Sequence, residues 1–403
     1  MKRASIALLL LAAGMAHAAG KVPEQGDPPK NTCYVDFIDI ATGLGVLIRC
    51  QDRNGRSLNL MFDGGSSDAL AGKLKNQYRF GYILDKGLKF PPGSTIHHLF
   101  QSHAHFDHHS ELVRKEGIIA NYDVKHVWDP AMRNDSVAYG CFMKAVITKA
   151  NERKLVYHPA KDCPDLTGLA CDGAAVRKFK ARSYYEPFTT TSVDEPMEKA
   201  YAVNFGGVDG ITARILHANP NFKGEKHNKS SLVVMLDLFG VKLLLTGDEE
   251  ADEKKSDVET LLINARADLQ ANIVQVAHHG SDTSSTQPFV DAVVINGRRG
   301  PDTYAVISSG TVEYSGVQLP RDDVVTRWEN AVGRGRVLST KLYDVAHPAR
   351  PECKNHPEKI APDPKNDEST AGCNNIQFVI KKGPGGRGYI DSVQYWPLGP
   401  RIN

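Results

Sequence analysis

The most informative stretch of the chain is Ser102-His103-Ala104-His105-Phe106-Asp107-His108-His109. It closely follows an apolar run, Ile96 to Phe100, which predicts a strand. On a turn that leaves a strand, His103 and His105 can point to one side while Asp107 and His108 reach to the other. Imidazole and carboxylate are the ligand types expected for zinc, manganese or iron. The segment therefore predicts two neighbouring divalent metal ions, with zinc preferred over manganese or iron.

Short apolar runs rich in β-branched residues recur along the chain, and helix-like stretches separate several of them. Strands are predicted at Tyr34 to Ile40, Val46 to Arg49, Ser57 to Phe62, Ile96 to Phe100, Lys125 to Trp128, Ile211 to Leu216, Leu232 to Leu238, Val241 to Leu245, Asn272 to Ala277, Thr303 to Ile307 and Ile376 to Ile380. Helices are predicted at Glu249 to Ala265, Gln287 to Ile295 and Arg321 to Val332. This order favours an α/β protein with two sheets. The cysteine-bearing segment 129–204 has little strand signal, so we expect it to be an insertion covering one rim of the fold.

The first eighteen residues are expected to form a secretory signal peptide. Lys2 and Arg3 precede an apolar run from Ile6 to Met15, and Ala16-His17-Ala18 is a small-residue cleavage signature. The run is shorter than the roughly 20 residues that a membrane-spanning helix needs, and no later segment reaches that length. We therefore expect a periplasmic or secreted mature chain, residues 19–403, without a transmembrane segment.

All seven cysteines follow the expected cleavage site, and an oxidising compartment lets disulfides persist. Cys33 and Cys50 bracket two predicted strands, which would place them opposite each other across a hairpin. We predict a disulfide between them. Proximity suggests two further pairs, Cys163 with Cys171 and Cys353 with Cys373, which leaves Cys141 over.

The charge balance of the chain restricts its partners. There are 49 Lys and Arg against 47 Asp and Glu, and removal of Lys2 and Arg3 with the leader makes the mature chain formally neutral. A strongly basic nucleic-acid binder is excluded. A small-molecule or phosphodiester substrate fits this balance, whereas the net charge does not support a nucleic acid. The oligomeric state is left open.

The histidine run resembles the signature of the metallo-β-lactamase-fold hydrolases, and later motifs agree in order and spacing. They are Asp63 in Met61-Phe62-Asp63-Gly64-Gly65, His227 four residues before Ser231, Asp248 in Leu245-Thr246-Gly247-Asp248, and His278-His279-Gly280-Ser281. The resemblance implies one domain over residues 19–403, an αββα sandwich of two mixed β-sheets flanked by helices.

The resemblance also implies a ligand set for each metal. His103, His105 and His227 would bind the first ion, and Asp107, His108 and His278 the second, with Asp248 bridging the two. His279 competes with His278 for the last position. His217, which also ends a strand, is an alternative to His227, which we favour for its spacing to the next strand and to Asp248.

Other roles follow from the same resemblance. Asp63 would orient the metal-binding loop. Asp107 and Asp248 could orient a hydroxide held between the metals as the nucleophile. The developing negative charge on the substrate could be bound by His279 or, at the rim of the site, by Ser281 or His109.

Within this superfamily the chain is most similar to the extracytoplasmic hydrolase domain of the competence protein ComEC. The matching segments are Phe37-Ile38-Asp39-Ile40-Ala41-Thr42-Gly43, Asn228-Lys229-Ser230-Ser231-Leu232-Val233, Leu244-Leu245-Thr246-Gly247-Asp248 and His278-His279-Gly280-Ser281. This resemblance implies an exported metal-dependent hydrolase of a phosphodiester or nucleic-acid-like substrate. Two alternatives stay open: a β-lactamase- or lactonase-like hydrolase of a cyclic amide or ester, and a non-catalytic, metal-stabilised binding protein.

Overall fold

The computed structural model describes residues 22–67, 80–114, 117–160, 165–176, 178–179, 186–188, 200–219, 227–251, 258–265, 268–297, 300–310, 316–341 and 374–396. The expected signal peptide, Cys163, Cys353 and Cys373 lie outside these residues. Within the described residues, no helix is long and apolar enough to cross a membrane.

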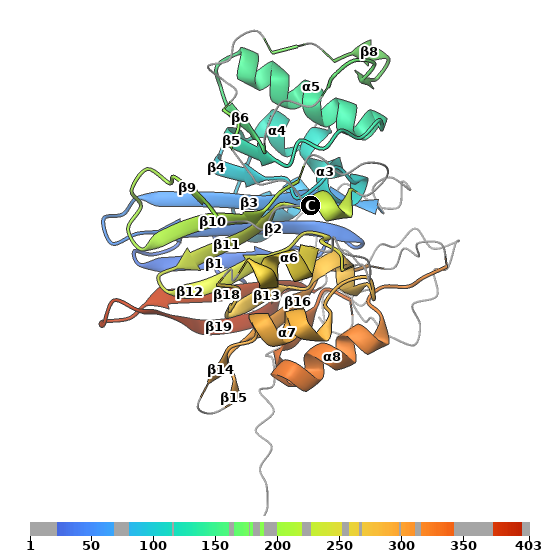
Figure 1. Cartoon of the computed structure of the whole chain (residues 1–403). Helices are drawn as coiled ribbons and strands as arrows, with labels where there is room; N and C mark the ends of the chain where they lie inside the picture. Colours follow the sequence, from blue (N-terminus) through green and yellow to red (C-terminus); the bar gives the residue numbers. More distant parts are fainter. Residues whose placement is uncertain are drawn as a thin grey trace, which may run out of the picture.

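The fold is mixed α/β, with two large mixed sheets flanked by helices (Figure 1). The eight-stranded sheet has the order β19-β18-β1-β2-β3-β4-β5-β6. Its strands are β1 (Thr32–Phe37), β2 (Gly43–Gln51), β3 (Ser57–Ser66), β4 (Thr95–Phe100), β5 (Asp123–Asp129), β6 (Val156–Pro159), β18 (Asn375–Lys382) and β19 (Gly388–Trp396). Strands β3 to β6 run parallel to one another, and the other neighbours are antiparallel.

The seven-stranded sheet has the order β17-β16-β13-β12-β11-β10-β9. Its strands are β9 (Tyr201–Val203), β10 (Ile211–His217), β11 (Val233–Leu238), β12 (Val241–Leu245), β13 (Ile273–Gln275), β16 (Tyr304–Ile307) and β17 (Val337–Ser339). Strands β12, β13, β16 and β17 are parallel. Two short hairpins, β7 (Ala170–Cys171) with β8 (Ala174–Ala175) and β14 (Asn296–Gly297) with β15 (Gly300–Pro301), lie outside the two sheets.

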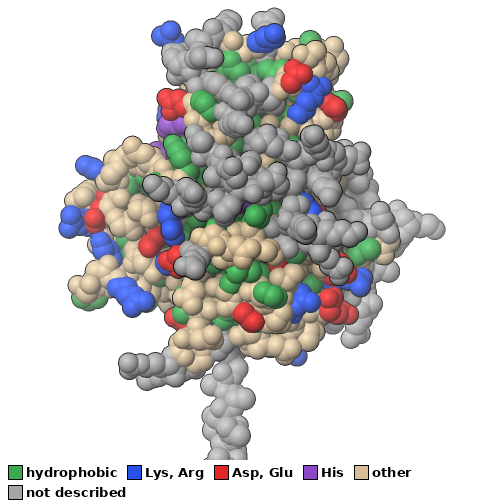
Figure 2. All heavy atoms as spheres, viewed as in Figure 1, with side chains coloured by type: hydrophobic (Ala, Val, Ile, Leu, Met, Phe, Trp, Pro, Cys, Tyr) green, Lys and Arg blue, Asp and Glu red, His purple; other side chains and the backbone are tan. Residues whose placement is uncertain are grey.

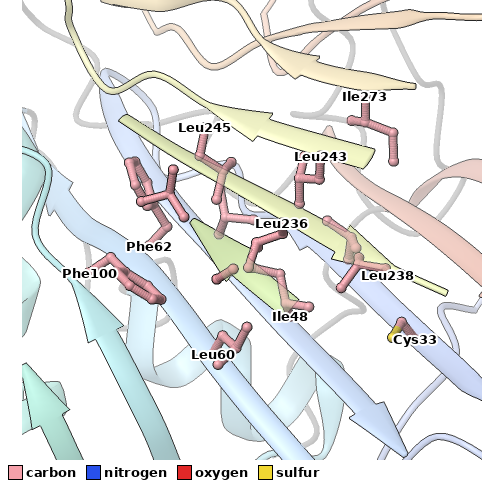
Figure 3. Packing of buried hydrophobic residues seen from close by; sticks show 14 of the residues in the cluster. Cys33, Ile48, Leu60, Phe62, Phe100, Leu236, Leu238, Leu243, Leu245 and Ile273 are labelled. Carbon is pink, nitrogen blue, oxygen red and sulfur yellow. The ribbon is translucent and has the colours of Figure 1, made fainter. Parts of the chain in front are cut away.

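Apolar side chains from both sheets meet in one core between them. Figure 3 shows Ile48, Leu60 and Phe62 of one sheet among Leu236 and Leu243 of the other. Because strand residues alternate between faces, every second residue enters this core and the others face the flanking helices. The core therefore holds the two sheets, and the loops at their ends, in one arrangement.

The flanking helices cover the outer faces of the sheets. Their bounds are α2 (Phe80–Tyr82), the π-helix η2 (Ile83–Gly87), α3 (Phe106–Val113), α4 (Ile118–Asn121), α5 (Val137–Asn151), α6 (Val258–Asn264), α7 (Gln287–Val293) and α8 (Asp322–Val332). Short 3₁₀ turns are η4 (Asn228–Ser230), η5 (Ala277–Gly280) and η6 (Arg334–Arg336). Separate apolar clusters bury α3, α4 and α5 against the first sheet and α6, α7 and α8 against the second.

Every predicted strand and helix has a counterpart in the structure. The helix predicted from Glu249 to Ala265 corresponds to α6, which the structure describes from Val258 to Asn264. Segment 129–204, which has little strand signal in the sequence, contains α5 and the edge strands β6 and β9 of the two sheets. In α5 the buried residues are Tyr139, Gly140, Phe142, Met143, Val146, Ile147 and Ala150. Most of them recur three or four residues apart, the spacing of one helix face, so the sequence did carry a signal for this helix.

The structure contains the predicted Cys33–Cys50 disulfide, which joins register partners on β1 and β2. The pairing of Cys163 with Cys171 is wrong, because Cys171 bonds Cys141 of α5 instead. These residues are 30 positions apart, so proximity in sequence did not reveal the pair. Two disulfides are typical of a protein that matures outside the cytoplasm.

Candidate metal centre

The candidate metal-binding residues lie on loops that leave the carboxyl ends of strands. His103 and His105 occupy the loop between β4 and α3, and Asp107 and His108 form the first turn of α3. Asp248 follows β12, and His279 follows β13. The strands of one sheet face those of the other across the core, so these loops meet at one edge of the sandwich.

Two glycines allow these loops to approach each other closely. A Cβ at Gly65 would lie only 2.5 Å from the backbone nitrogen of His108, so glycine lets β3 contact the start of α3. Gly247 has φ +60°, and a Cβ there would lie 2.6 Å from the Cβ of Ser102. Glycine is favoured at such positions because it lacks a Cβ and adopts left-handed backbone angles at little cost.

Four buried side chains form the centre of the site: Asp107, His108, Asp248 and His279. One ligand atom from each lies within 4.8 Å of the others. Asp248 Oδ2 is 3.1 Å from His108 Nε2 and 3.5 Å from His279 Nε2. His279 Nε2 is also 3.3 Å from Asp107 Oδ2. Segments 140 residues apart in sequence therefore converge on one small volume.

Hydrogen bonds outside the cluster orient both of its imidazoles. His279 Nδ1 lies 2.8 Å from the carbonyl of Ser308, and His108 Nδ1 lies 2.7 Å from Asp63 Oδ2. A carbonyl or carboxylate oxygen accepts, so each Nδ1 carries a proton, and each Nε2 either carries a second proton toward the carboxylates or, in the neutral ring, offers its lone pair to a cation. His108 Nε2, His279 Nε2 and Asp248 Oδ1 are buried without a hydrogen-bond partner. This donor set fits a metal ion, which accepts such lone pairs.

A second group of histidines adjoins this cluster. His103 Nε2 is 3.0 Å from His105 Nδ1 and 3.8 Å from Asp248 Oδ2. The rings of His105 and His227 have centroids 5.3 Å apart. The structure thus brings the three residues of the predicted first ligand set together, and Asp248 is the member of the four-residue cluster that lies next to His103.

The alternative His217 is placed differently. Its Nδ1 donates to the carbonyl of Ser231 at 2.8 Å, and burial lowers its pKa to about 4. Within the described part of the chain, no hydrogen bond, ion pair or ring contact links it to the other histidines. His217 Nε2 is nevertheless buried without a hydrogen-bond partner, and the observation in favour of His227 is its ring contact with His105.

Electrostatic coupling is strong within the cluster. Burial opposes the charge on His108, but Asp248 and Asp63 outweigh it and raise the pKa of His108 well above its usual value. Burial likewise opposes ionisation of Asp248, but the positive charges of His108 and His279 lower its pKa far below the usual value. For His103, burial and the nearby charge of His108 both lower the pKa. The buried carboxylates thus require positive charge beside them, which protons or a cation can supply.

Asp63 contacts the loop as expected from the resemblance. Its Oδ1 accepts from the backbone nitrogen of Ser102 at 2.6 Å, while Oδ2 accepts from His108. We predict that Asp63→Asn weakens metal affinity by about 10–100-fold, because the amide nitrogen cannot accept the His108 proton. Competition with a chromophoric chelator measures this. Unchanged affinity would contradict the orienting role, and the exposed Asp391→Asn serves as the matched control.

The predicted last ligand, His278, lies outside the cluster, and His279 occupies that position. His278 Nδ1 is 2.8 Å from Thr283 Oγ1 and 3.4 Å from Glu250 Oε1, and its side chain is 22% exposed. Both histidines have left-handed backbone angles, with φ 50° and 54°. The two side chains therefore leave the turn in different directions, and only His279 points inward.

The two predicted rim residues are also placed differently from expectation. His109 is fully buried against Phe106, Tyr139 and Phe142, so its placement at the substrate rim is wrong. It lies on the face of α3 that packs on α5. Ser281 is 7% exposed, and its Oγ lies 3.0 Å from Thr283 Oγ1. His278 is the more exposed group at this edge.

Two positioning residues were not predicted from the sequence. Gln275 Oε1 accepts from the backbone nitrogens of Thr246 and Gly247, both at 2.8 Å, and so holds the turn that carries Asp248. Ser231 Oγ accepts from the Asp248 nitrogen at 3.2 Å. The signal for Gln275 was a polar residue inside an otherwise apolar strand, since a buried amide needs fixed partners.

Comparison with known proteins gives two partial matches. No family model matches the chain. An uncharacterized protein, YcaI of Escherichia coli (strain K12), is 33% identical over 105 residues, which are 26% of this chain and 12% of that protein. Competence protein ComA of Neisseria gonorrhoeae is 29% identical over 148 residues, 33% of this chain and 20% of its own length. The chain thus spans at most a fifth of either relative, and a third of it is similar to a competence protein.

Proposed function

We propose that this protein is an exported, metal-dependent hydrolase of the metallo-β-lactamase fold that cleaves a phosphodiester. The observation that carries the proposal is the convergence of His108 Nε2 and His279 Nε2 on Asp107 and Asp248, with each imidazole oriented from outside. The two flanked sheets, the two disulfides and the partial similarity to a competence protein support it.

The residues would form the two ligand sets that the resemblance implies, with His279 in the place of His278. His103, His105 and His227 would hold one ion, and Asp107, His108 and His279 the other, with Asp248 within reach of both sets. Bound there, divalent ions would supply Lewis-acid polarisation and a water activated at neutral pH.

The polypeptide itself would contribute orientation and charge. Asp63 and the Ser308 carbonyl hold His108 and His279 in their tautomers. At the exposed edge, Asn228 donates to Glu250 at 2.8 Å and lies 3.3 Å from His278 Nε2. Together with the bond between His278 Nδ1 and Thr283 Oγ1, these contacts would hold the His278 ring in place at the open edge of the site.

Metal removal tests this proposal. We expect dialysis against a chelator to abolish cleavage of an aryl phosphodiester, and zinc or manganese to restore it. A metal that binds only the native state raises the free energy of unfolding by about 2.7 kcal/mol when the free metal concentration is 100 times its Kd. The Tm should therefore rise when the metal is added back. A substrate panel with a β-lactam and a lactone is the control for substrate class. Hydrolysis of the β-lactam or the lactone without cleavage of any phosphodiester would contradict the phosphodiester proposal and indicate a β-lactamase- or lactonase-like enzyme. A metal-dependent Tm without hydrolysis of any substrate would indicate a binding protein.

A further inference from the structure

A large cavity adjoins the candidate metal centre on the side of His105. Its volume is about 1210 Å³. The walls come from α2 and η2, α3, the loop and first turn of α5, and Cys171 with Asp172. Typical small-molecule sites have about 300–1,000 Å³, so this cavity holds more than a scissile phosphate group. His105 belongs both to the cavity wall and to the histidine group of the metal centre.

The wall is mainly apolar. Tyr82, Phe106, Val113, Tyr122 and Val137 contribute most of its large apolar side chains. Val137 is 63% exposed although it is a large hydrophobic residue. An apolar wall left open to water is characteristic of a surface that binds an apolar group.

The charged groups of the wall oppose a polyanionic ligand. Among the described lining residues there are three carboxylates, Asp85, Glu111 and Asp172, and one guanidinium, Arg114. Arg114 forms an ion pair with Glu111, with 3.1 Å between Arg114 Nε and Glu111 Oε1. On the face that Figure 2 displays, the described Lys and Arg also lie in small separate groups, some of them beside Asp or Glu. A nucleic-acid site needs cations facing successive phosphates, and this wall lacks them among its described residues.

We infer that the cavity binds an uncharged, apolar arm of the substrate, with the scissile phosphodiester at the His105 end. The substrate class is a small phosphodiester with an alkyl or aryl group, rather than a polynucleotide. This inference rests on the proposed function for the scissile group, while the cavity chemistry itself is independent of it. Each methylene buried in the cavity should raise affinity up to about fourfold, since burial of CH₂ gives about 0.8 kcal/mol.

Val137 offers a substitution that places charge in the cavity without weakening its helix. It is the first residue of α5, after the cap in which Ser136 Oγ accepts from the Tyr139 nitrogen. An aspartate is favourable at a helix N-terminus, so Val137→Asp should fold. Val22→Asp, at a 74% exposed valine that does not line the cavity, is the matched control.

The test uses metal-loaded protein and 4-nitrophenyl phosphodiesters with methyl, butyl and octyl groups. For the wild-type protein we expect kcat/KM to rise at least tenfold from the methyl to the octyl ester. Val137→Asp should reduce this increase, and Val22→Asp should leave it unchanged. Calorimetric binding of alkylphosphonates of the same lengths gives a readout that needs no turnover. A rate and affinity independent of chain length, or a preference for an oligonucleotide, would overturn the inference. Phosphonate binding that rises with chain length without any hydrolysis would uphold the cavity and refute the proposed phosphodiesterase activity.

Discussion

Replacement of Asp248 by alanine is expected to reduce kcat/KM for an aryl phosphodiester by about 10³-fold or more. Asp248 Oδ2 lies within 3.8 Å of nitrogens from both histidine groups, at His103, His108 and His279. Its loss removes a ligand shared by both proposed ions. Lewis-acid stabilisation is worth several kcal/mol, and each 1.36 kcal/mol corresponds to tenfold in rate.

Activity and metal content, measured together, check this expectation. Steady-state kinetics should show the rate loss, and elemental analysis should show fewer bound ions per chain. Asp248→Asn keeps the shape of the side chain and separates loss of charge from loss of fold. Asp391→Ala, on the edge strand β19 and paired with Lys381 at 2.7 Å, is the control and should behave as wild type. Full metal content and rate in Asp248→Ala would refute the shared-ligand role.

The second large effect distinguishes the adjacent histidines His278 and His279. His279→Ala should lower activity by about 10²–10³-fold and remove bound metal, because its Nε2 faces Asp107 and Asp248. His278→Ala should keep the metal and lose less than about tenfold, the cost of one edge hydrogen bond. The two variants change the same residue type on the same turn, so each controls for the other.

Kinetics and metal titration of both variants provide the measurement. The opposite ranking, with His278→Ala losing metal and His279→Ala retaining it, would restore the sequence-based ligand assignment. Equal loss in both would point to collapse of the turn, which circular dichroism and thermal melting of each variant detect.

Much of the fold could be predicted because local patterns specify it. Leu232 to Leu238 is short and rich in valine and leucine, a pattern that favours a buried strand over a helix, and both faces of β11 are buried. The Cys33–Cys50 pair was predictable because hairpin geometry places the two residues opposite each other. The Cys141–Cys171 pair was not, because it joins a helix to a distant hairpin through packing that no local pattern encodes.

The sequence by itself determined which loops carry the histidines and carboxylates, since His103, Asp248 and His278-His279 each follow a recognisable strand and His227 precedes one. Only the tertiary structure decided which of these side chains meet. His109 entered the α3–α5 interface because it lies on the packed face of the helix, and the left-handed turn at His278 and His279 directed only the second ring inward. The physical reason is that side-chain direction depends on backbone angles and packing partners, which residue spacing alone does not specify.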